Sequence, residues 1–241
     1  MHKTLAELWK ACGVSLPGVD PVIKPGQILI YALPLDCSSI KAVRPFLSID
    51  EKNRAALYNC ELDELHYAVS RTLLRGVLGL HIDCDPGELV FRYGSRGRPE
   101  LEQEQSAGFG FSLARRDDHL VVAIGHRRRI GIDLEAVRSA SMVEPILRML
   151  APKELAGLDL ELSCRQEPNR NRRLIHAWTA LEARAKAAGT GLEIGCDIAN
   201  NGDVECQSFD IGRDLIGCVA AEGLNWRLKL IRQEGLLPRT T

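Results

Sequence analysis

The sequence lacks closely spaced cysteines. Its eight cysteines are at least ten residues apart, and the closest two are Cys196 and Cys206. Zinc ribbons and thioredoxin-like sites need cysteines two residues apart, so neither interpretation has support. A chain of 241 residues also needs no disulfides to hold a core together. We therefore expect reduced, mostly buried thiols, as in a cytoplasmic protein.

The sequence also lacks an excess of charge, because 31 Lys and Arg residues face 32 Asp and Glu residues. Overall electrostatics therefore give no support to a nucleic-acid partner. No apolar run of about 18 residues occurs, so we expect no membrane span. Residues 1–10 lack the apolar stretch of a signal peptide, and Leu5, Leu8 and Trp9 instead predict a short amphipathic helix.

Helix and strand patterns occur together along the chain. Strands are predicted at residues 27–33, 89–93, 109–113, 119–124 and 130–135, and three or four more in an antiparallel sheet between 192 and 231. Helices are predicted at residues 48–80 in two pieces, 143–150, 152–158 and 174–188. Residues 114–118 are predicted to be a charged link between two strands. This mixture indicates an α+β fold.

One predicted strand carries two acids on the same face. Residues 130–135 alternate, with two isoleucines and a leucine toward a core and Gly131, Asp133 and Glu135 on the other side. The two acids are about 6–7 Å apart at Cα, so their carboxylates can converge on one ion, and such oxygen ligands suit Mg²⁺. We expect Gly131 to leave room for a ligand. Taken alone, an exposed acidic strand face explains the same pattern.

The helix predicted at residues 174–188 combines a buried stripe with a charged pair. Glu182 and Lys186 lie four residues apart on one face of the helix, where an ordinary surface salt bridge is the alternative explanation. The apolar stripe beside them consists of Leu174, Trp178, Leu181, Ala185 and Ala188. Leu181 is therefore expected to point into the core.

In this order and spacing, the two segments resemble the Sfp-type 4′-phosphopantetheinyl transferases. That family has a G-(I/V)-D-x-E strand and, further along, a W-x-x-K-E-(A/S)-x-x-K helix followed by G-x-G-L, which match residues 131–135, 178–186 and 189–192. Its early helix, its R-x-L-L-R and G-K-P elements and its late strand resemble residues 46–54, 71–75, 97–99 and 214–221. The resemblance covers about Gln27 to Ile231.

The resemblance implies the 4′-phosphopantetheinyl transferase fold, with two similar α/β halves related by a pseudo-two-fold axis. We expect an N-terminal extension at 1–26, halves at 27–127 and 128–241, and coenzyme A bound between them. Asp133, Glu135 and Glu182 are implied as ligands of Mg²⁺. The implied coenzyme A-binding residues are Arg54, Arg71, Thr72, Gly97, Arg98, Pro99, Arg115 and Lys186.

The implied reaction moves phosphopantetheine from coenzyme A to a serine of an apo acyl or peptidyl carrier protein and releases 3′,5′-ADP. Such a transfer needs positioning and charge neutralisation more than covalent help, which a metal ion and Lys186 supply. Glu182, or water on the metal ion, is the candidate base. We expect a cytoplasmic monomer, because internal duplication lets one chain form the site alone.

Two stretches depart from the family pattern. Ala114-Arg115-Arg116 replaces an S-H-S triplet that contacts phosphates in the family, so we expect Arg115 either to bind a phosphate or to be an exposed turn residue. Leu181 replaces a lysine. These changes predict reduced or specialised activity. A non-catalytic module that binds coenzyme A or a carrier, and a metal-dependent phosphohydrolase that uses the same carboxylates, are the alternative functions.

Basic residues flank the predicted metal strand and helix. Because carrier proteins are typically acidic around the acceptor serine, these residues predict a docking rim. An ordinary solvated loop is the alternative. The residues are Arg138, Arg148, Lys153, Arg165, Arg170, Arg172 and Arg173.

Overall fold

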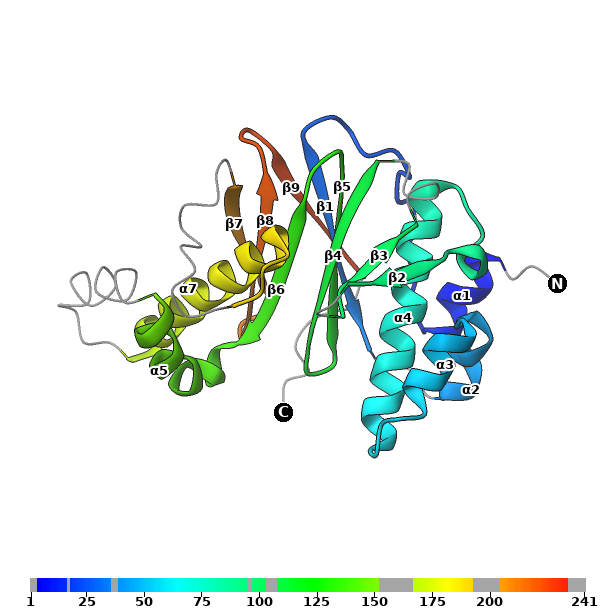
Figure 1. Ribbon diagram of the computed structural model, residues 1–241, viewed down its shortest axis with the longest axis horizontal. Coiled ribbons are helices and arrows are strands. Elements are labelled where there is room, and N and C mark those ends of the chain that lie inside the picture. The colour runs from blue at the N-terminus through cyan, green and yellow to red at the C-terminus, as the bar shows by residue number, and fades with distance from the viewer. Residues whose placement is uncertain are drawn as a thin grey trace.

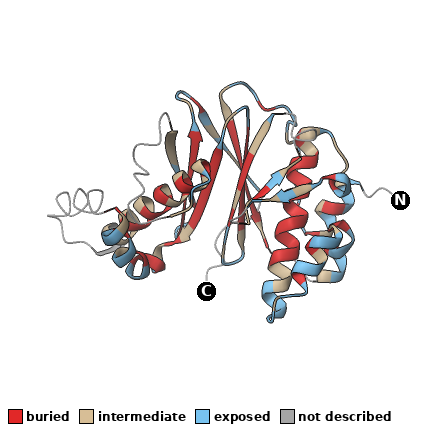
Figure 2. Cartoon of the chain, viewed as in Figure 1, coloured by how far each residue is buried: buried red, intermediate tan, exposed pale blue. Residues whose placement is uncertain are grey.

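Two β-sheets pack face to face, and helices cover the outer face of each sheet (Figure 1). The computed structural model describes residues 4–16, 18–35, 39–94, 97–102, 108–151, 167–192 and 204–233. Between the sheets lies an apolar layer to which Ile30 and Val121 of one sheet and Ile132 and Val219 of the other contribute. The resulting order of layers is helix, sheet, sheet, helix, and the inner strands are buried almost throughout (Figure 2).

The larger sheet has the strand order β4-β5-β1-β9. Strand β1 (Gln27–Pro34) is antiparallel to β5 (His119–His126), which pairs in turn with β4 (Phe109–Arg116). Strand β9 (Arg227–Arg232) lies parallel to β1 on its other side. Because β1 is covered on both faces, its residues form a continuous apolar run instead of an alternating one.

The smaller sheet has the antiparallel order β6-β8-β7. It consists of β6 (Ile130–Ala136), β7 (Val204–Ile211) and β8 (Leu215–Glu222). Helix α7 (Glu167–Ala188) lies across its outer face, next to α5 (Ala140–Leu150), which follows the short 3₁₀ helix η3 (Val137–Ser139).

The outer face of the larger sheet is covered by α4 (Glu61–Ile82), against which three shorter helices pack: α1 (Leu5–Ala11), α2 (Ile40–Val43) and α3 (Ile49–Ala55). The short 3₁₀ helices η1 (Arg44–Phe46) and η2 (Pro86–Glu88) and the hairpin of β2 (Phe91–Tyr93) and β3 (Pro99–Leu101) complete this half. In the part of the chain that is described, no helix is long and apolar enough to cross a membrane.

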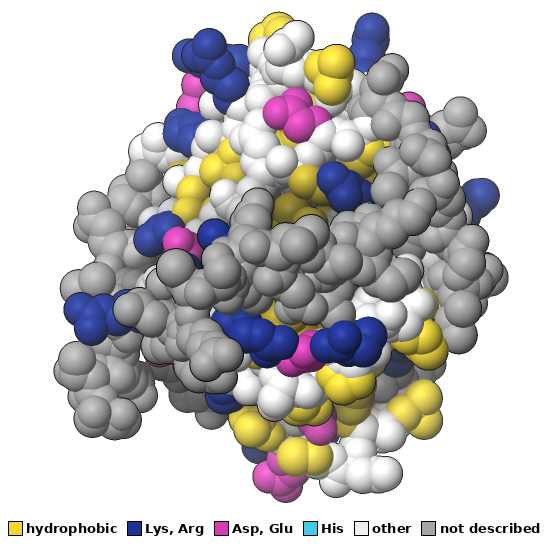
Figure 3. All heavy atoms as spheres, turned by 90° about the vertical axis from the view of Figure 1, so that its left-hand side faces the viewer, with side chains coloured by type: hydrophobic (Ala, Val, Ile, Leu, Met, Phe, Trp, Pro, Cys, Tyr) yellow, Lys and Arg dark blue, Asp and Glu magenta, His cyan; other side chains and the backbone are white. Residues whose placement is uncertain are grey.

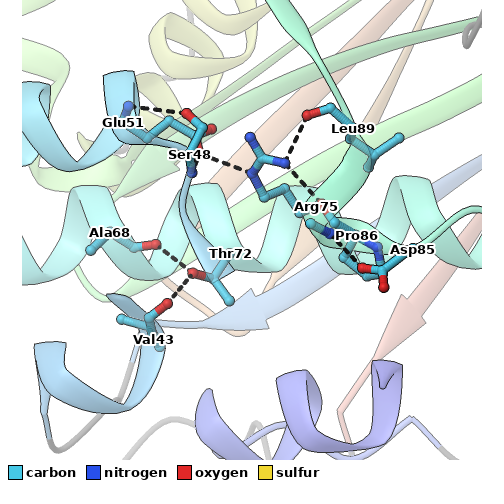
Figure 4. A network of polar contacts seen from close by, with 10 residues as sticks. Val43, Ser48, Glu51, Ala68, Thr72, Arg75, Asp85, Pro86 and Leu89 are labelled. Carbon is cyan, nitrogen blue, oxygen red and sulfur yellow. Dashed lines mark hydrogen bonds and ion pairs between the residues drawn. The ribbon is translucent and has the colours of Figure 1, made fainter. Parts of the chain in front are cut away.

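A buried arginine holds the helical layer together (Figure 4). Arg75, 1% exposed, donates from Nε to Glu51 Oε2 at 2.8 Å. Its Nη1 donates to the carbonyl oxygens of Pro86 and Leu89, each at 2.8 Å. The guanidinium therefore joins α3, α4 and the chain around η2. Removing one partner of such a buried pair typically costs about 3–5 kcal/mol.

Helix α7 approaches β6 so closely that only glycine fits between them. A Cβ atom on Gly131 would overlap the backbone carbonyl of Ala183 and the backbone nitrogen of Ala187. Two alanines of α7, residues 183 and 187, pack with Ala220 of β8 in the same layer. The prediction that Gly131 makes room for a ligand is therefore wrong: it makes room for the backbone of α7.

The α+β prediction is confirmed, with corrections to individual elements. Residues 114–116 extend β4 instead of linking two strands, and the turn is made by Asp117, whose φ is +53°, and Asp118. The last strand, β9, joins the larger sheet in parallel, so it does not belong to the antiparallel sheet expected for the C-terminal segment. The helix predicted at 152–158 lies outside the described residues.

None of the described cysteines is in a disulfide. Cys12 and Cys218 are buried, Cys84 and Cys206 are partly exposed, and Cys60 is exposed. The expected absence of disulfides therefore holds for these positions, whereas burial of the thiols holds only for some of them.

We predict that Gly131→Ala destabilises the protein by about 2–4 kcal/mol, because the added methyl group forces α7 away from β6. Urea unfolding measures the change. Gly94→Ala is the matched control, since a Cβ atom on Gly94 would meet nothing within 4 Å. Equal stabilities of the two variants would contradict the close packing of α7 on β6.

Candidate active site

Acids from β6 and from α7 come together at one edge of the smaller sheet. Lys186 Nζ donates to Asp133 Oδ1 at 2.6 Å, which links the helix to the strand. Burial raises the pKa of the Glu182 carboxyl, and the charge of Asp133 raises it further. Burial raises the pKa of Glu135 as well, again with a contribution from Asp133. The structure therefore brings together the four residues that the sequence assigns to the metal and catalytic site.

Local structure explains this convergence. The alternation of β6 turns Asp133 and Glu135 to the face that α7 covers, and Ile132 to the inner layer. One turn of α7 separates Glu182 from Lys186, so both reach the same end of the strand. Gly189, with φ of +75°, ends the helix directly beyond them, as the sequence predicts.

The acids have the chemistry of a divalent-cation site. Asp133 Oδ2 and Glu135 Oε2 are buried and accept no hydrogen bond. Buried carboxylate oxygens that lack donors, beside a third acid whose pKa is raised, are stabilised when a cation binds them. Carboxylate oxygens are also the ligands that Mg²⁺ prefers. The donor atoms present therefore have the chemistry that this ion prefers.

Basic side chains nevertheless hold two of the acids. Lys186 pairs with Asp133, and Arg116 Nη1 lies 3.1 Å from Glu135 Oε2. In this arrangement no three His, Cys, Asp or Glu side chains of the described residues are grouped closely enough to enclose a metal ion.

A cavity of about 400 Å³ adjoins the acids. Strand β4 lies between α4 on one side and α7 on the other (Figure 1). Residues of all three elements line the cavity. Of the residues that the sequence predicts to bind coenzyme A or to act in catalysis, those that line it are Arg71, Gly97, Arg98, Pro99, Glu182 and Lys186.

Arg71 points a cation toward this cavity. Its guanidinium lies 5.2 Å from the ring centre of Tyr67 and 5.5 Å from that of Tyr93. Its Nη1 is buried and donates no hydrogen bond. The guanidinium of Arg54, which is not among the lining residues, lies 5.7 Å from the Tyr93 ring centre. A buried nitrogen without an acceptor beside a cavity indicates a place for an anionic group.

Two predicted coenzyme A-binding residues lie elsewhere. Thr72 is fully buried in α4, and its hydroxyl donates to Ala68 O at 3.0 Å, so its role is within the helical layer. Arg115 is exposed and shares a face of β4 with Leu113, while Arg116 reaches the acids. The sequence prediction missed Arg116. If residues 114–116 had been assigned to the strand, the period of two along β4 would have shown that Arg116, and not Arg115, shares a face with Ser112 and Ala114.

The side chain of Arg98, which lines the cavity, joins helix α7 to strands β4 and β6. One side chain donates to the carbonyl oxygens of Lys186 in α7, Phe111 in β4 and Ile130 in β6, the last two at 3.2 and 2.9 Å. The sequence predicts Arg98 only as one of the residues that bind coenzyme A. Its side chain has a further role, since it fixes α7 against β4 where Lys186 must be positioned.

The predicted basic rim is largely neutralised. Arg138 pairs with Asp117 at 2.5 Å, and Arg172 pairs with Asp210 at 2.7 Å. Arg148 and Arg170 both pair with Glu144. Lys153 and Arg165 lie outside the described residues.

The fold and the site define a class: an α+β protein in which clustered acids and a lysine border a cavity suited to a phosphate-bearing ligand. Residues 129–234, which include strands β6 to β9, match the model of the 4′-phosphopantetheinyl transferase superfamily. The 4′-phosphopantetheinyl transferase HetI of Nostoc sp. is 31% identical over 172 residues, which are 69% of this chain and 70% of that protein.

Two further relatives agree. The protein slr0495 of Synechocystis sp. is 28% identical over 170 residues, 70% of this chain and 68% of its own. The 4′-phosphopantetheinyl transferase psf-1 of Bacillus pumilus is 24% identical over 156 residues, 65% of this chain and 64% of its own. The chain therefore belongs to the 4′-phosphopantetheinyl transferase superfamily.

We predict that Arg98→Ala lowers the free energy of unfolding by about 2–4 kcal/mol, because three carbonyl oxygens on α7, β4 and β6 lose the side chain that joins them. Arg98→Lys, which keeps the charge but not the fork of donors, is expected to lose less. Arg92→Ala is the control, since this side chain is 75% exposed and should change stability by about 0.5 kcal/mol or less. Urea unfolding of the three variants measures these changes. If Arg98→Ala were no less stable than Arg92→Ala, Arg98 would act only as a surface charge.

Proposed function

We propose that this chain transfers the 4′-phosphopantetheine group of coenzyme A to a serine of an acyl or peptidyl carrier protein and releases 3′,5′-ADP. The convergence of Asp133, Glu135, Glu182 and Lys186 beside one cavity, in a chain of this superfamily, carries the proposal. It acts as a monomer, since one chain supplies all of these residues, and it acts in the cytoplasm, where the thiols of a chain without closely spaced cysteines stay reduced.

Coenzyme A lies in the cavity between α4 and α7. Arg71 supplies a charge for its 3′-phosphate, because the free Nη1 is held beside the cavity by two tyrosine rings. The backbone of Gly97 and Pro99 faces the adenine. Lys186 reaches the diphosphate as a point charge from the opposite wall.

Asp133, Glu135 and Glu182 would hold Mg²⁺, which when bound neutralises the diphosphate and the leaving 3′,5′-ADP. Lys186 moves its ammonium from Asp133 to a phosphate oxygen when the nucleotide enters. Lys186 lines the cavity and also bonds to Asp133, so its ammonium lies between the acid and the place of the phosphates.

Glu182 accepts the proton of the attacking serine. Burial and the neighbouring acids favour its protonated form, which makes the ionised carboxylate a stronger base than an exposed glutamate. Its position in the cavity lining, one turn before Lys186, puts the base next to the group that binds the phosphate. The serine oxygen then attacks the phosphorus that bears the pantetheine arm.

Leu181 stands where the family pattern has a lysine, and its packing shows why helix α7 accepts a leucine there. Its side chain is 9% exposed and packs with Leu174, Trp178 and residues of α5, as the sequence predicts. The leucine therefore strengthens the contact between α5 and α7, and Lys186 supplies the positive charge of this helix at the cavity.

The carrier docks on the exposed face of α5. Met142, Ile146 and Met149 lie along one side of this helix and are 70%, 38% and 55% exposed. This side of the molecule shows hydrophobic side chains together with Lys and Arg side chains that have acidic ones between them (Figure 3). Such a face suits an amphipathic carrier helix with acidic residues at its rim.

The mass of an apo-carrier incubated with the protein, Mg²⁺ and coenzyme A tests the proposal. We predict a gain of the phosphopantetheine mass, and a loss of rate of about 100-fold or more for Asp133→Asn, which removes one site charge at constant shape. Asp210→Asn, on β7 of the same sheet, is the control. Bound coenzyme A without transfer would instead favour a binding module, and phosphate release without a carrier would favour a phosphohydrolase.

We further predict that Arg71→Met raises the KM for coenzyme A about tenfold and leaves the KM for 3′-dephospho-coenzyme A unchanged, because only the first substrate offers an anion to Nη1. Methionine keeps much of the apolar stem between the tyrosine rings. Arg92→Met controls for the loss of a charge. An equal rise of KM for both substrates would contradict the proposal that Arg71 binds the 3′-phosphate.

A further inference from the structure

Arg116 brings a permanent positive charge to the acidic site from outside β6 and α7. Its Nη1 lies 3.1 Å from Glu135 Oε2, and its Nη2 donates to Ser139 Oγ at 2.5 Å. The guanidinium therefore bridges the end of β6 and the start of α5. Nothing in the proposed chemistry uses it.

The placement follows from the face of β4 on which Arg116 lies. Ser112, Ala114 and Arg116 are two residues apart along β4, so they lie on the same face of the strand, toward the inner layer. On this face Ser112 Oγ accepts a hydrogen bond from Ile132 N at 3.2 Å. Strand β4 thus runs beside β6, and its last residue reaches the last acid of β6. Arg116 stands where the S-H-S triplet of the resembling family has its second serine.

Arg116 and Glu135 form an ion pair, but not a bidentate hydrogen-bonded one. Glu135 Oε2 accepts no hydrogen bond, and the buried Nε of Arg116 donates none. Ser139, rather than the carboxylate, fixes the orientation of the guanidinium. The arginine therefore adds a charge to the site while the lone pairs of Glu135 stay available to another ligand.

We propose that Arg116 is an internal counter-ion that sets the affinity of the acidic site for divalent cations. Without the cation, the guanidinium offsets the repulsion between Glu135 and Asp133, so the protein stays stable. With the cation, the same charge opposes binding. This inference rests on the proposed function, because it takes Asp133, Glu135 and Glu182 as the cation ligands.

The test is the affinity of the purified full chain for Mn²⁺, used as a paramagnetic probe of the Mg²⁺ site and measured by the signal of free Mn²⁺. Arg116→Ser is expected to lower the Kd about tenfold, because a like charge beside a ligand is removed. Arg138→Ser is the matched control: this arginine pairs with Asp117, next to Arg116 in the chain, and should leave the Kd unchanged.

Thermal unfolding provides a second readout that does not depend on activity. Arg116→Ser is expected to melt at a lower temperature than the unchanged protein without a cation, and to gain more from added Mg²⁺. If Arg116→Ser folds poorly, Arg116→Gln removes the charge and retains a side chain able to donate to Ser139.

The outcomes separate this inference from the proposed function. A tighter Kd for both Arg116 variants, with Arg138→Ser unchanged, supports the inference. If the Arg116 variants bind Mn²⁺ as the unchanged protein does, while Asp133→Asn abolishes binding, the inference is wrong and the cation site stands. If neither the unchanged protein nor the Arg116 variants bind Mn²⁺, both are overturned.

Discussion

The contact between the backbones of β6 and α7 is the constraint on which the site depends. Gly131 lets the helix lie directly against the strand, and this contact places Lys186 within 2.6 Å of Asp133. A side chain at position 131 would separate the two elements by about the thickness of a methyl group. The acids of the strand and the charged groups of the helix would then no longer meet as Asp133 and Lys186 do.

Polar side chains then secure this geometry across the layers. Arg98 joins β4, β6 and α7 through their carbonyl oxygens, and Arg75 does the same for the helices of the other half. Each arginine donates several hydrogen bonds to acceptors on different elements, so removing it is expected to cost more than removing a surface ion pair. The cavity lies between two regions that are each fixed in this way.

Charge balance distinguishes this chain from the family pattern that its motifs resemble. Lys186 and Arg116 pair with Asp133 and Glu135, so the acids are partly neutralised without a metal ion. Leucine at position 181 removes a cation from α7 and adds apolar contact with α5. The departures therefore redistribute positive charge around the acids, and they do so without opening the core.

Local periodicity in the sequence was enough to determine the faces of β6 and α7, the end of α7 at Gly189 and the α+β class, because each depends on residues only two to four positions apart. Tertiary structure alone decided that β9 pairs with β1, that Gly131 accommodates α7, and that Arg116, not Arg115, reaches the acids. These contacts join residues far apart in the chain, and their energies depend on packing between layers, which no local pattern records.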